Sequence, residues 1–184
     1  MCENESAFYG SFTGSDGGSL VMSVHSVRKF LAPWGKSEDI LEFEESSATV
    51  ELAALRLSVE PARIAKTIAF YNSPDSDGSN SAILVIAAGD RRIDNAKFKS
   101  AFGIKSKMLS ADDVLRLTGH AVGGVCPFDN PPQSKVYADI SIKEFDTVFP
   151  ACGSSNSAIE MTISEIYQIS HALGWVDVCK ERLL

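Results

Sequence analysis

The feature that most constrains the fold is the uninterrupted apolar stretch Ala82–Ala87. A continuous apolar run of this length is typical of a strand buried on both faces, because a half-exposed strand alternates apolar and polar residues. The polar loop 73–81 precedes the run, and Gly89-Asp90 ends it. With 184 residues, of which 45% are hydrophobic and 22% charged, the chain is sized for one domain with an ordinary core around this strand.

Helical and strand patterns follow one another along the rest of the chain in an irregular order, with no repeat at a fixed period. This order favours an α+β domain built on a curved mixed sheet. We expect a flexible tail over 1–20, because Gly10–Ser19 is rich in glycine and serine, and the folded domain over 21–184. The expected helices are 23–31, 46–57, a short turn opened by Pro61, 94–102, 110–117 and 162–173, and the further strands are 67–71, 136–142, 146–149 and 158–161.

Composition argues against several classes of protein. No apolar run approaches the roughly 20 residues of a membrane span, and no basic region followed by an apolar run opens the chain, so we expect a cytoplasmic protein without membrane contact. The cysteines form no CxxC pair and the histidines no HExxH motif, so we expect reduced thiols, no metal and no cofactor. These residues are Cys2, Cys126, Cys152, Cys179, His25, His120 and His171.

The most informative loop is Thr118–Phe128, which lies between an expected helix and an expected strand. Its adjacent glycines, Gly123 and Gly124, let backbone approach a ligand and present N–H groups without side-chain obstruction, and Pro127 fixes the turn beyond them. Backbone donors of this kind suit an oxyanion. The loop is interpreted either as a tight structural turn or as a ligand-binding loop.

Three blocks of the sequence resemble, in order, the signature blocks of the YbaK family. They are Lys66-Thr67-Ile68, Ala88–Lys97 and Thr118–Phe128, and the later pieces Val148–Gly153 and Ala158–Met161 are similar to that family's closing strands. The family includes Cys-tRNA(Pro) deacylases, ProX-type deacylases and the editing domain of bacterial prolyl-tRNA synthetases. The resemblance implies a barrel-like sheet flanked by helices, an aminoacyl-tRNA 3′ end as ligand, and prolyl-tRNA synthetase as a partner.

The resemblance also assigns roles to individual residues. The family's essential lysine corresponds to Lys66, its glycine loop to Gly123, Gly124 and Pro127, and a late-loop glycine to Gly153. Lys66 would be protonated, since an unperturbed lysine has a pKa of about 10.4, and would hold the terminal phosphate or the developing oxyanion. Without the resemblance, this lysine would be interpreted as an ordinary solvated side chain.

The remaining expected substrate-binding residues belong to the same loop: His120, Val125, Cys126 and Phe128. Cys126 is interpreted as lining the amino-acid pocket rather than as a nucleophile, because no neighbouring residue in the sequence supplies a base. His120 stands where the Cys-tRNA deacylases have an aromatic residue, and is interpreted as bracing the loop. Asp129-Asn130-Pro131-Pro132 departs from the glycine that usually follows in the family, which predicts a different loop geometry there.

We therefore predict a trans-editing aminoacyl-tRNA deacylase acting on Cys- or Ala-tRNA(Pro). We expect the Lys66 ammonium and the glycine-loop amides to converge on one small cavity. Two alternatives stay open: a non-catalytic module that binds tRNA or a synthetase, and a thiol enzyme using Cys126. The formal charge of -7 argues against extensive contact with nucleic acid, but is compatible with an enzyme that grips only the terminal nucleotide.

Overall fold

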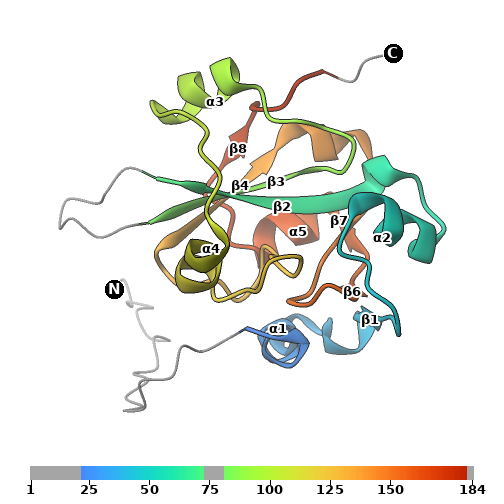
Figure 1. Ribbon diagram of the computed structural model, residues 1–184. Coiled ribbons are helices and arrows are strands. Elements are labelled where there is room, and N and C mark those ends of the chain that lie inside the picture. Colours follow the sequence, from blue (N-terminus) through green and yellow to red (C-terminus); the bar gives the residue numbers. More distant parts are fainter. Residues whose placement is uncertain (1–21, 73–80, 182–184) are drawn as a thin grey trace, which may run out of the picture.

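The computed structural model describes residues 22–72 and 81–181, so the expected tail 1–20 lies outside the described part (Figure 1). None of the described helices has the length and apolar character needed to cross a bilayer. The elements in chain order are α1 (Val24–Leu31), η1 (Ala32–Trp34), η2 (Ser37–Asp39), β1 (Leu41–Glu42), α2 (Val50–Leu57), η3 (Pro61–Arg63), β2 (Ile64–Tyr71), β3 (Ala82–Ala88), α3 (Asn95–Phe102), α4 (Ala111–Thr118), β4 (Ser134–Asp139), η4 (Ile140–Glu144), β5 (Thr147–Pro150), β6 (Ser157–Ala158), β7 (Met161–Thr162), α5 (Ile163–Ile169) and β8 (Trp175–Val176).

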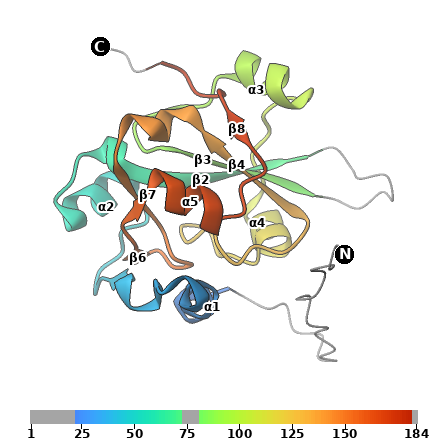
Figure 2. The same ribbon diagram turned by 180° about the vertical axis from the view of Figure 1, so that it is seen from behind.

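A six-stranded mixed sheet in the order β7-β5-β2-β3-β4-β8 forms the centre of the molecule. β2 pairs antiparallel with β3 and parallel with β5, while β3 and β4 run parallel. A second, two-stranded sheet joins β1 to β6. Helices flank the central sheet on both sides (Figures 1 and 2), which confirms the predicted α+β class with a curved mixed sheet.

The central strand β3 is buried along its whole length, as its apolar sequence predicts. Leu84 and Ile86 face the larger core, which also contains residues of α1, α4 and α5. Ile83 and Val85 face a second cluster, which is closed by Phe98 of α3. The two faces of the sheet are therefore covered by different parts of the chain. Successive side chains of β2 point to opposite faces, so even-numbered and odd-numbered residues of this strand contact different parts of the chain.

Some element boundaries differ from those expected. The strand predicted over 136–142 stops at Asp139, whose Oδ1 accepts a hydrogen bond 3.0 Å long from Ser141 N and so begins the 3-10 turn η4. The strand predicted over 158–161 is divided between β6 and β7, and the last helix ends at Ile169. β1 and β8 were not predicted, because two residues show no periodicity.

Gly89, which ends β3, lies in a space that admits no side chain. A Cβ atom built there would be 2.1 Å from the carbonyl oxygen of Pro61 and 2.6 Å from a methyl carbon of Val50. The absence of a side chain at Gly89 thus lets α2 and η3 pack directly against the end of the central strand.

We predict that Gly89→Ala lowers the free energy of unfolding by about 3 kcal/mol, because backbone and helix must shift to admit the methyl group. Gly174→Ala is the control, since a Cβ there meets nothing within 4 Å, and its effect should stay within about 1 kcal/mol. Urea denaturation of both variants measures the difference. Equal stability of Gly89→Ala and Gly174→Ala would contradict this packing.

Candidate active site

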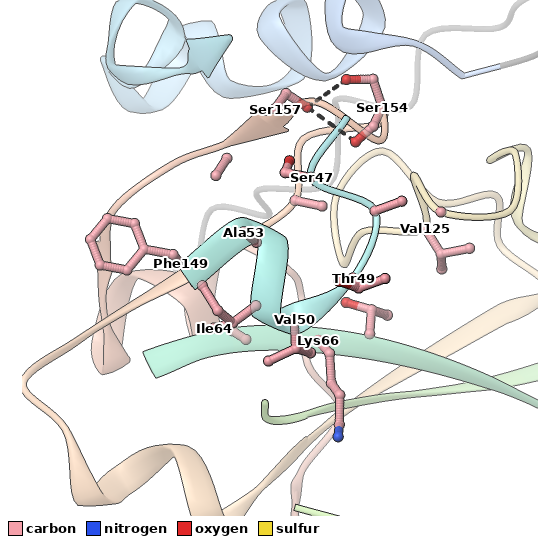
Figure 3. Close-up of a pocket in the computed structure, with 16 residues that line it drawn as sticks. Ser47, Thr49, Val50, Ala53, Ile64, Lys66, Val125, Phe149, Ser154 and Ser157 are labelled. Carbon is pink, nitrogen blue, oxygen red and sulfur yellow. Dashed lines mark hydrogen bonds between the residues drawn. The ribbon is translucent and has the colours of Figure 1, made fainter. Parts of the chain in front are cut away.

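A small pocket opens where three loops meet above the first half of β2 (Figure 3). Its volume is about 150 Å³, below the range of drug-sized ligand sites. Lys66 is the one charged residue among the described residues that line it. The lining residues are Ser47, Ala48, Thr49, Val50, Ala53, Ile64, Ala65, Lys66, Thr67, Gly123, Val125, Phe149, Ala151, Ser154, Ser157 and Ala158.

Direct backbone contacts fix the three loops against one another. Ser47 N donates to Ser155 O at 2.6 Å, which joins the segment before α2 to the late loop. A Cβ on Gly124 would lie 3.0 Å from Ser154 Cα and 3.1 Å from the carbonyl carbon of Gly153. Gly124 therefore lets the glycine loop pack on the late loop, so the structure brings together two of the segments that the sequence singled out.

The glycine loop offers two free amides beside the pocket. Gly123 has φ +86°, in the region that glycine favours, and lines the pocket together with Val125. Gly124 N donates to Ala121 O at 3.0 Å and so is used within the turn. Within residues 22–72 and 81–181, no hydrogen bond occupies the amides of Gly123 and Val125. Of the loop amides expected to act as hydrogen-bond donors, that of Gly124 is therefore occupied, whereas those of Gly123 and Val125 belong to residues that line the pocket.

Lys66 is the third residue of β2, inside the strand rather than at its junction with the preceding helix. Its half-buried ammonium donates to Gly89 O at 2.7 Å and to Arg91 O. Burial lowers the pKa of Lys66, while the nearby charges of Asp90 and Glu51 act in the opposite direction. An ammonium group has three N–H donors, so two bonds to carbonyl oxygens leave one donor for a ligand.

The Lys66 side chain leaves β2 on the opposite face from its neighbour Thr67, since successive side chains of a strand alternate. Figure 3 shows it directed away from Val125 and Ser154. The expected convergence of ammonium and loop amides is therefore not the arrangement in the structure. Lys66 lines the same pocket as Gly123, but its side chain is directed away from Val125 and Ser154, and its ammonium is held beside the turn that follows β3.

The hydroxyl residues that line the pocket were not predicted from sequence as site residues; they are Ser47, Thr49, Thr67, Ser154 and Ser157. Thr67 Oγ1 is buried and has no hydrogen-bond partner among the described residues, although it lines the pocket. Thr49, the N-cap of α2, accepts from Leu52 N through its side chain at 3.2 Å. The only sequence signal for Thr67 was its place next to Lys66. For Thr49 there was no such signal, because the helix that it caps was expected to begin at 46, with Ser46 or Ser47 as the N-cap.

Three of the expected substrate-binding residues, His120, Cys126 and Phe128, are fully buried and do not line the pocket. His120 Nε2 lies 3.1 Å from Phe128 O and 3.6 Å from Cys126 Sγ, and burial lowers the pKa of this histidine. This position agrees with a loop-bracing histidine. Burial also raises the pKa of the Cys126 thiol to about 12, which disfavours the thiol-enzyme alternative because the nucleophile would be a thiolate.

The other two expected residues, Pro127 and Gly153, do not line the pocket either. Pro127 borders a separate surface cavity of about 400 Å³ together with Phe30 and His171. Gly153 has φ +84°, and a Cβ there would come within 2.9 Å of Ser23 O. Gly153 thus brings the late loop against the start of α1. In the described part of the chain, no group of three His, Cys, Asp or Glu residues is placed to hold a metal ion.

Comparison with known proteins places these observations in a family. Residues 44–169 match the aminoacyl-tRNA editing domain, so the chain belongs to that family. It is 49% identical over 160 residues to an uncharacterized protein, YwhH, of Bacillus subtilis (strain 168), a match that covers 87% of this chain and 99% of that protein. It is also 33% identical over 119 residues to a proline–tRNA ligase of Lysinibacillus sphaericus (strain C3-41), which covers 61% of this chain and 20% of the ligase.

A solved structure agrees with the fold. It is described as a candidate trans-editing enzyme for prolyl-tRNA synthetase and matches with a TM-score of 0.74 at 24% identity, over 86% of this chain and 97% of the other. At this identity the likeness bears on the fold alone. Together with the family match, it confirms the predicted resemblance to the editing proteins.

We predict that the described cysteines, Cys126, Cys152 and Cys179, resist a thiol reagent at pH 8 in the folded protein, because all three are buried and burial raises their pKa values. A Cys2→Ser background removes the cysteine outside the described residues. The reagent should react at least about 100-fold faster after denaturation in guanidinium. A thiol that reacts within seconds in the native protein would contradict the assignment of these cysteines to the core.

Proposed function

We propose that this protein is a trans-acting aminoacyl-tRNA deacylase, which hydrolyses the ester bond of mischarged tRNA, with Cys-tRNA(Pro) or Ala-tRNA(Pro) as substrate. The observation that carries the proposal is a small pocket that combines two unoccupied loop amides with one lysine in a member of the editing family. The relation to a proline–tRNA ligase supports the tRNA(Pro) assignment. It also supports prolyl-tRNA synthetase as a partner.

The chemistry required is modest, because an aminoacyl ester is already activated. A water oxygen attacks the ester carbonyl carbon, the bond to the terminal ribose oxygen breaks, and one proton of that water passes to the ribose oxygen while its hydroxyl becomes part of the carboxyl group of the free amino acid. The negative charge on the carbonyl oxygen in the transition state needs fixed donors, and the amides of Gly123 and Val125 serve this purpose. No covalent intermediate is needed.

Lys66 is assigned to the phosphate of the terminal nucleotide rather than to the oxyanion. Its ammonium is held by the carbonyl oxygens of Gly89 and Arg91, and its side chain is directed away from Val125 (Figure 3). A compact charge with one remaining donor suits a phosphate oxygen. In this arrangement, Lys66 binds one side of the terminal nucleotide while the ester enters the pocket beyond Thr67.

The lining of the pocket favours a small, uncharged amino acid. Its volume of about 150 Å³ leaves little room, and its side chains are mainly methyl groups and hydroxyls, such as those of Ala151 and Ser157. No carboxylate belongs to the described lining, so a cationic side chain would lose its hydration without gaining a partner. Alanine and cysteine meet both conditions.

We predict that Lys66→Ala lowers deacylation of Ala-tRNA(Pro) or Cys-tRNA(Pro) by at least about 100-fold, since both the phosphate contact and the bracing of the turn after β3 are lost. Lys29→Ala, at an exposed position of α1, is the control and should keep full activity. The assay is a panel of mischarged tRNAs, with circular dichroism to verify folding. Equal rates for wild type and Lys66→Ala would overturn the assignment, and tRNA binding without hydrolysis in wild type would favour the non-catalytic module.

We predict that Thr67→Val lowers kcat/KM about three- to tenfold, the value of one hydrogen bond to the substrate, without lowering thermal stability. The Thr67 hydroxyl has no partner among the described residues, so its removal costs the fold nothing. Thr162→Val is the opposite control. Thr162 Oγ1 caps α5 away from the pocket, where it accepts from Glu165 N at 3.2 Å, so this change should lower stability and leave kcat/KM unchanged. Loss of stability without loss of activity in Thr67→Val would contradict the substrate contact.

A further inference from the structure

The acidic chain contains one strongly basic segment, 91–107, which we call the basic strap. It holds six of the 17 Lys and Arg residues and one of the 24 Asp and Glu residues, a net charge of +5. The rest of the chain therefore carries a net charge of -12. The overall charge of -7, which argued against extensive contact with nucleic acid, is thus the sum of a basic segment and a strongly acidic remainder.

The basic strap covers one face of the central sheet. It contains α3 and parts of its flanking loops, and α3 lies at one end of the sheet in Figure 1. Its apolar side chains pack inward on β2 and β3, in the cluster that contains Phe70 and Val85. These inward residues are Ile93, Phe98, Phe102 and Ile104. The basic residues alternate with them in sequence, so packing the strap on the sheet leaves most of the basic residues on its outer side.

Four basic residues of the strap are exposed and form no ion pair with a described residue: Arg92, Lys99, Lys105 and Lys107. Lys107 Nζ lies over the ring of Tyr71, 5.0 Å from its centre, and the other two basic residues form ion pairs. Arg91 pairs with Glu144, and Lys97 with Asp177 at 2.8 Å, so both hold the strap to the rest of the fold. Exposed positive charges that have no carboxylate partner repel one another, and a bound polyanion relieves that repulsion.

The basic strap begins at the candidate active site. Arg91 O accepts from Lys66 Nζ, and the charge of Arg92 acts to lower the pKa of Lys66. The Lys66 side chain also leaves β2 on the face that carries Ile68 and Phe70, which is the face the strap covers. A phosphate bound at Lys66 and the phosphates that precede it in its own chain can therefore lie along the strap on the same face of the sheet.

We propose that the basic strap is the docking surface for the phosphate backbone of the tRNA acceptor arm, with Lys99, Lys105 and Lys107 as phosphate contacts. This inference rests on the proposed function, because that function brings the 3′ end of a tRNA to the pocket. The terminal phosphate lies at Lys66, and the preceding phosphates follow the strap. Such contacts set the position of the tRNA without reading its sequence. The acidic remainder of the surface repels RNA elsewhere.

The test compares two triple variants that remove the same charge. Lys99→Gln/Lys105→Gln/Lys107→Gln neutralises the strap, and Lys29→Gln/Arg56→Gln/Lys143→Gln neutralises three exposed cations outside it. Arg92 is left intact because it adjoins Lys66. Fluorescence anisotropy with labelled, uncharged tRNA(Pro) between 50 and 200 mM salt gives the affinity and its salt dependence.

The strap variant should lose at least about tenfold in affinity, and its log–log salt slope should become shallower by about two to three, roughly one for each lost phosphate contact. The control variant should change affinity by less than about threefold. Equal losses in both variants, or no measurable binding of tRNA by wild type, would overturn the docking surface. Equally strap-dependent binding to anionic lipid vesicles would also overturn it, because the surface would then not be one for RNA.

A second measurement separates this proposal from the proposed function. The strap variant should hydrolyse a minimal substrate, the 3′-alanyl ester of adenosine, as fast as wild type, but should lose kcat/KM on full Ala-tRNA(Pro). An equal loss on both substrates would overturn the docking role. If wild type hydrolyses neither substrate while strap-dependent tRNA binding persists, the proposed function fails and the docking surface stands.

Discussion

The hydrogen bonds that Lys66 donates to the carbonyl oxygens of Gly89 and Arg91 fix the position of the one charged side chain among the described residues that line the pocket. They join β2 to the turn after β3, and they hold the ammonium on the face of the sheet opposite Thr67. A lysine side chain has high rotational freedom, and two carbonyl acceptors remove most of it before a ligand arrives. The Lys66 ammonium and the Thr67 hydroxyl therefore lie on opposite sides of β2, and in the proposed function these two sides bind the terminal phosphate and the ester, respectively.

The packing of three loops supplies the other half of the site. Gly124 allows the glycine loop to lie on the late loop, and Ser47 ties the segment before α2 to the same place. The amides of Gly123 and Val125 are then held next to the pocket by backbone contacts rather than by mobile side chains. Preorganised donors of this kind stabilise developing charge without reorganisation during the reaction. The buried Cys126 belongs to the support beneath the loop and does not line the pocket.

The sequence predicted the central strand, most helices and the family, because these depend on apolar periodicity, capping residues and local motifs. It placed Gly123 at the pocket correctly, since a double glycine marks close backbone approach. It did not reveal that Cys126 points into the core. Side-chain direction can be predicted from the periodicity of a helix or strand, but a loop has no such periodicity. The basic strap was visible as a run of charges, but its nearness to Lys66 depends on how α3 and the flanking loops pack on the sheet.

The central claim is that the Lys66 ammonium binds the terminal phosphate and not the oxyanion. It is tested most directly by kcat/KM for two minimal substrates, the 3′-alanyl ester of adenosine and the same ester of adenosine 5′-monophosphate, with wild type and Lys66→Met. Wild type should prefer the phosphorylated ester by about tenfold or more, the value of a charge-assisted hydrogen bond of about 1.5–3 kcal/mol, and Lys66→Met should abolish that preference. An equal fall in kcat/KM for both esters, with the preference kept, would contradict the account.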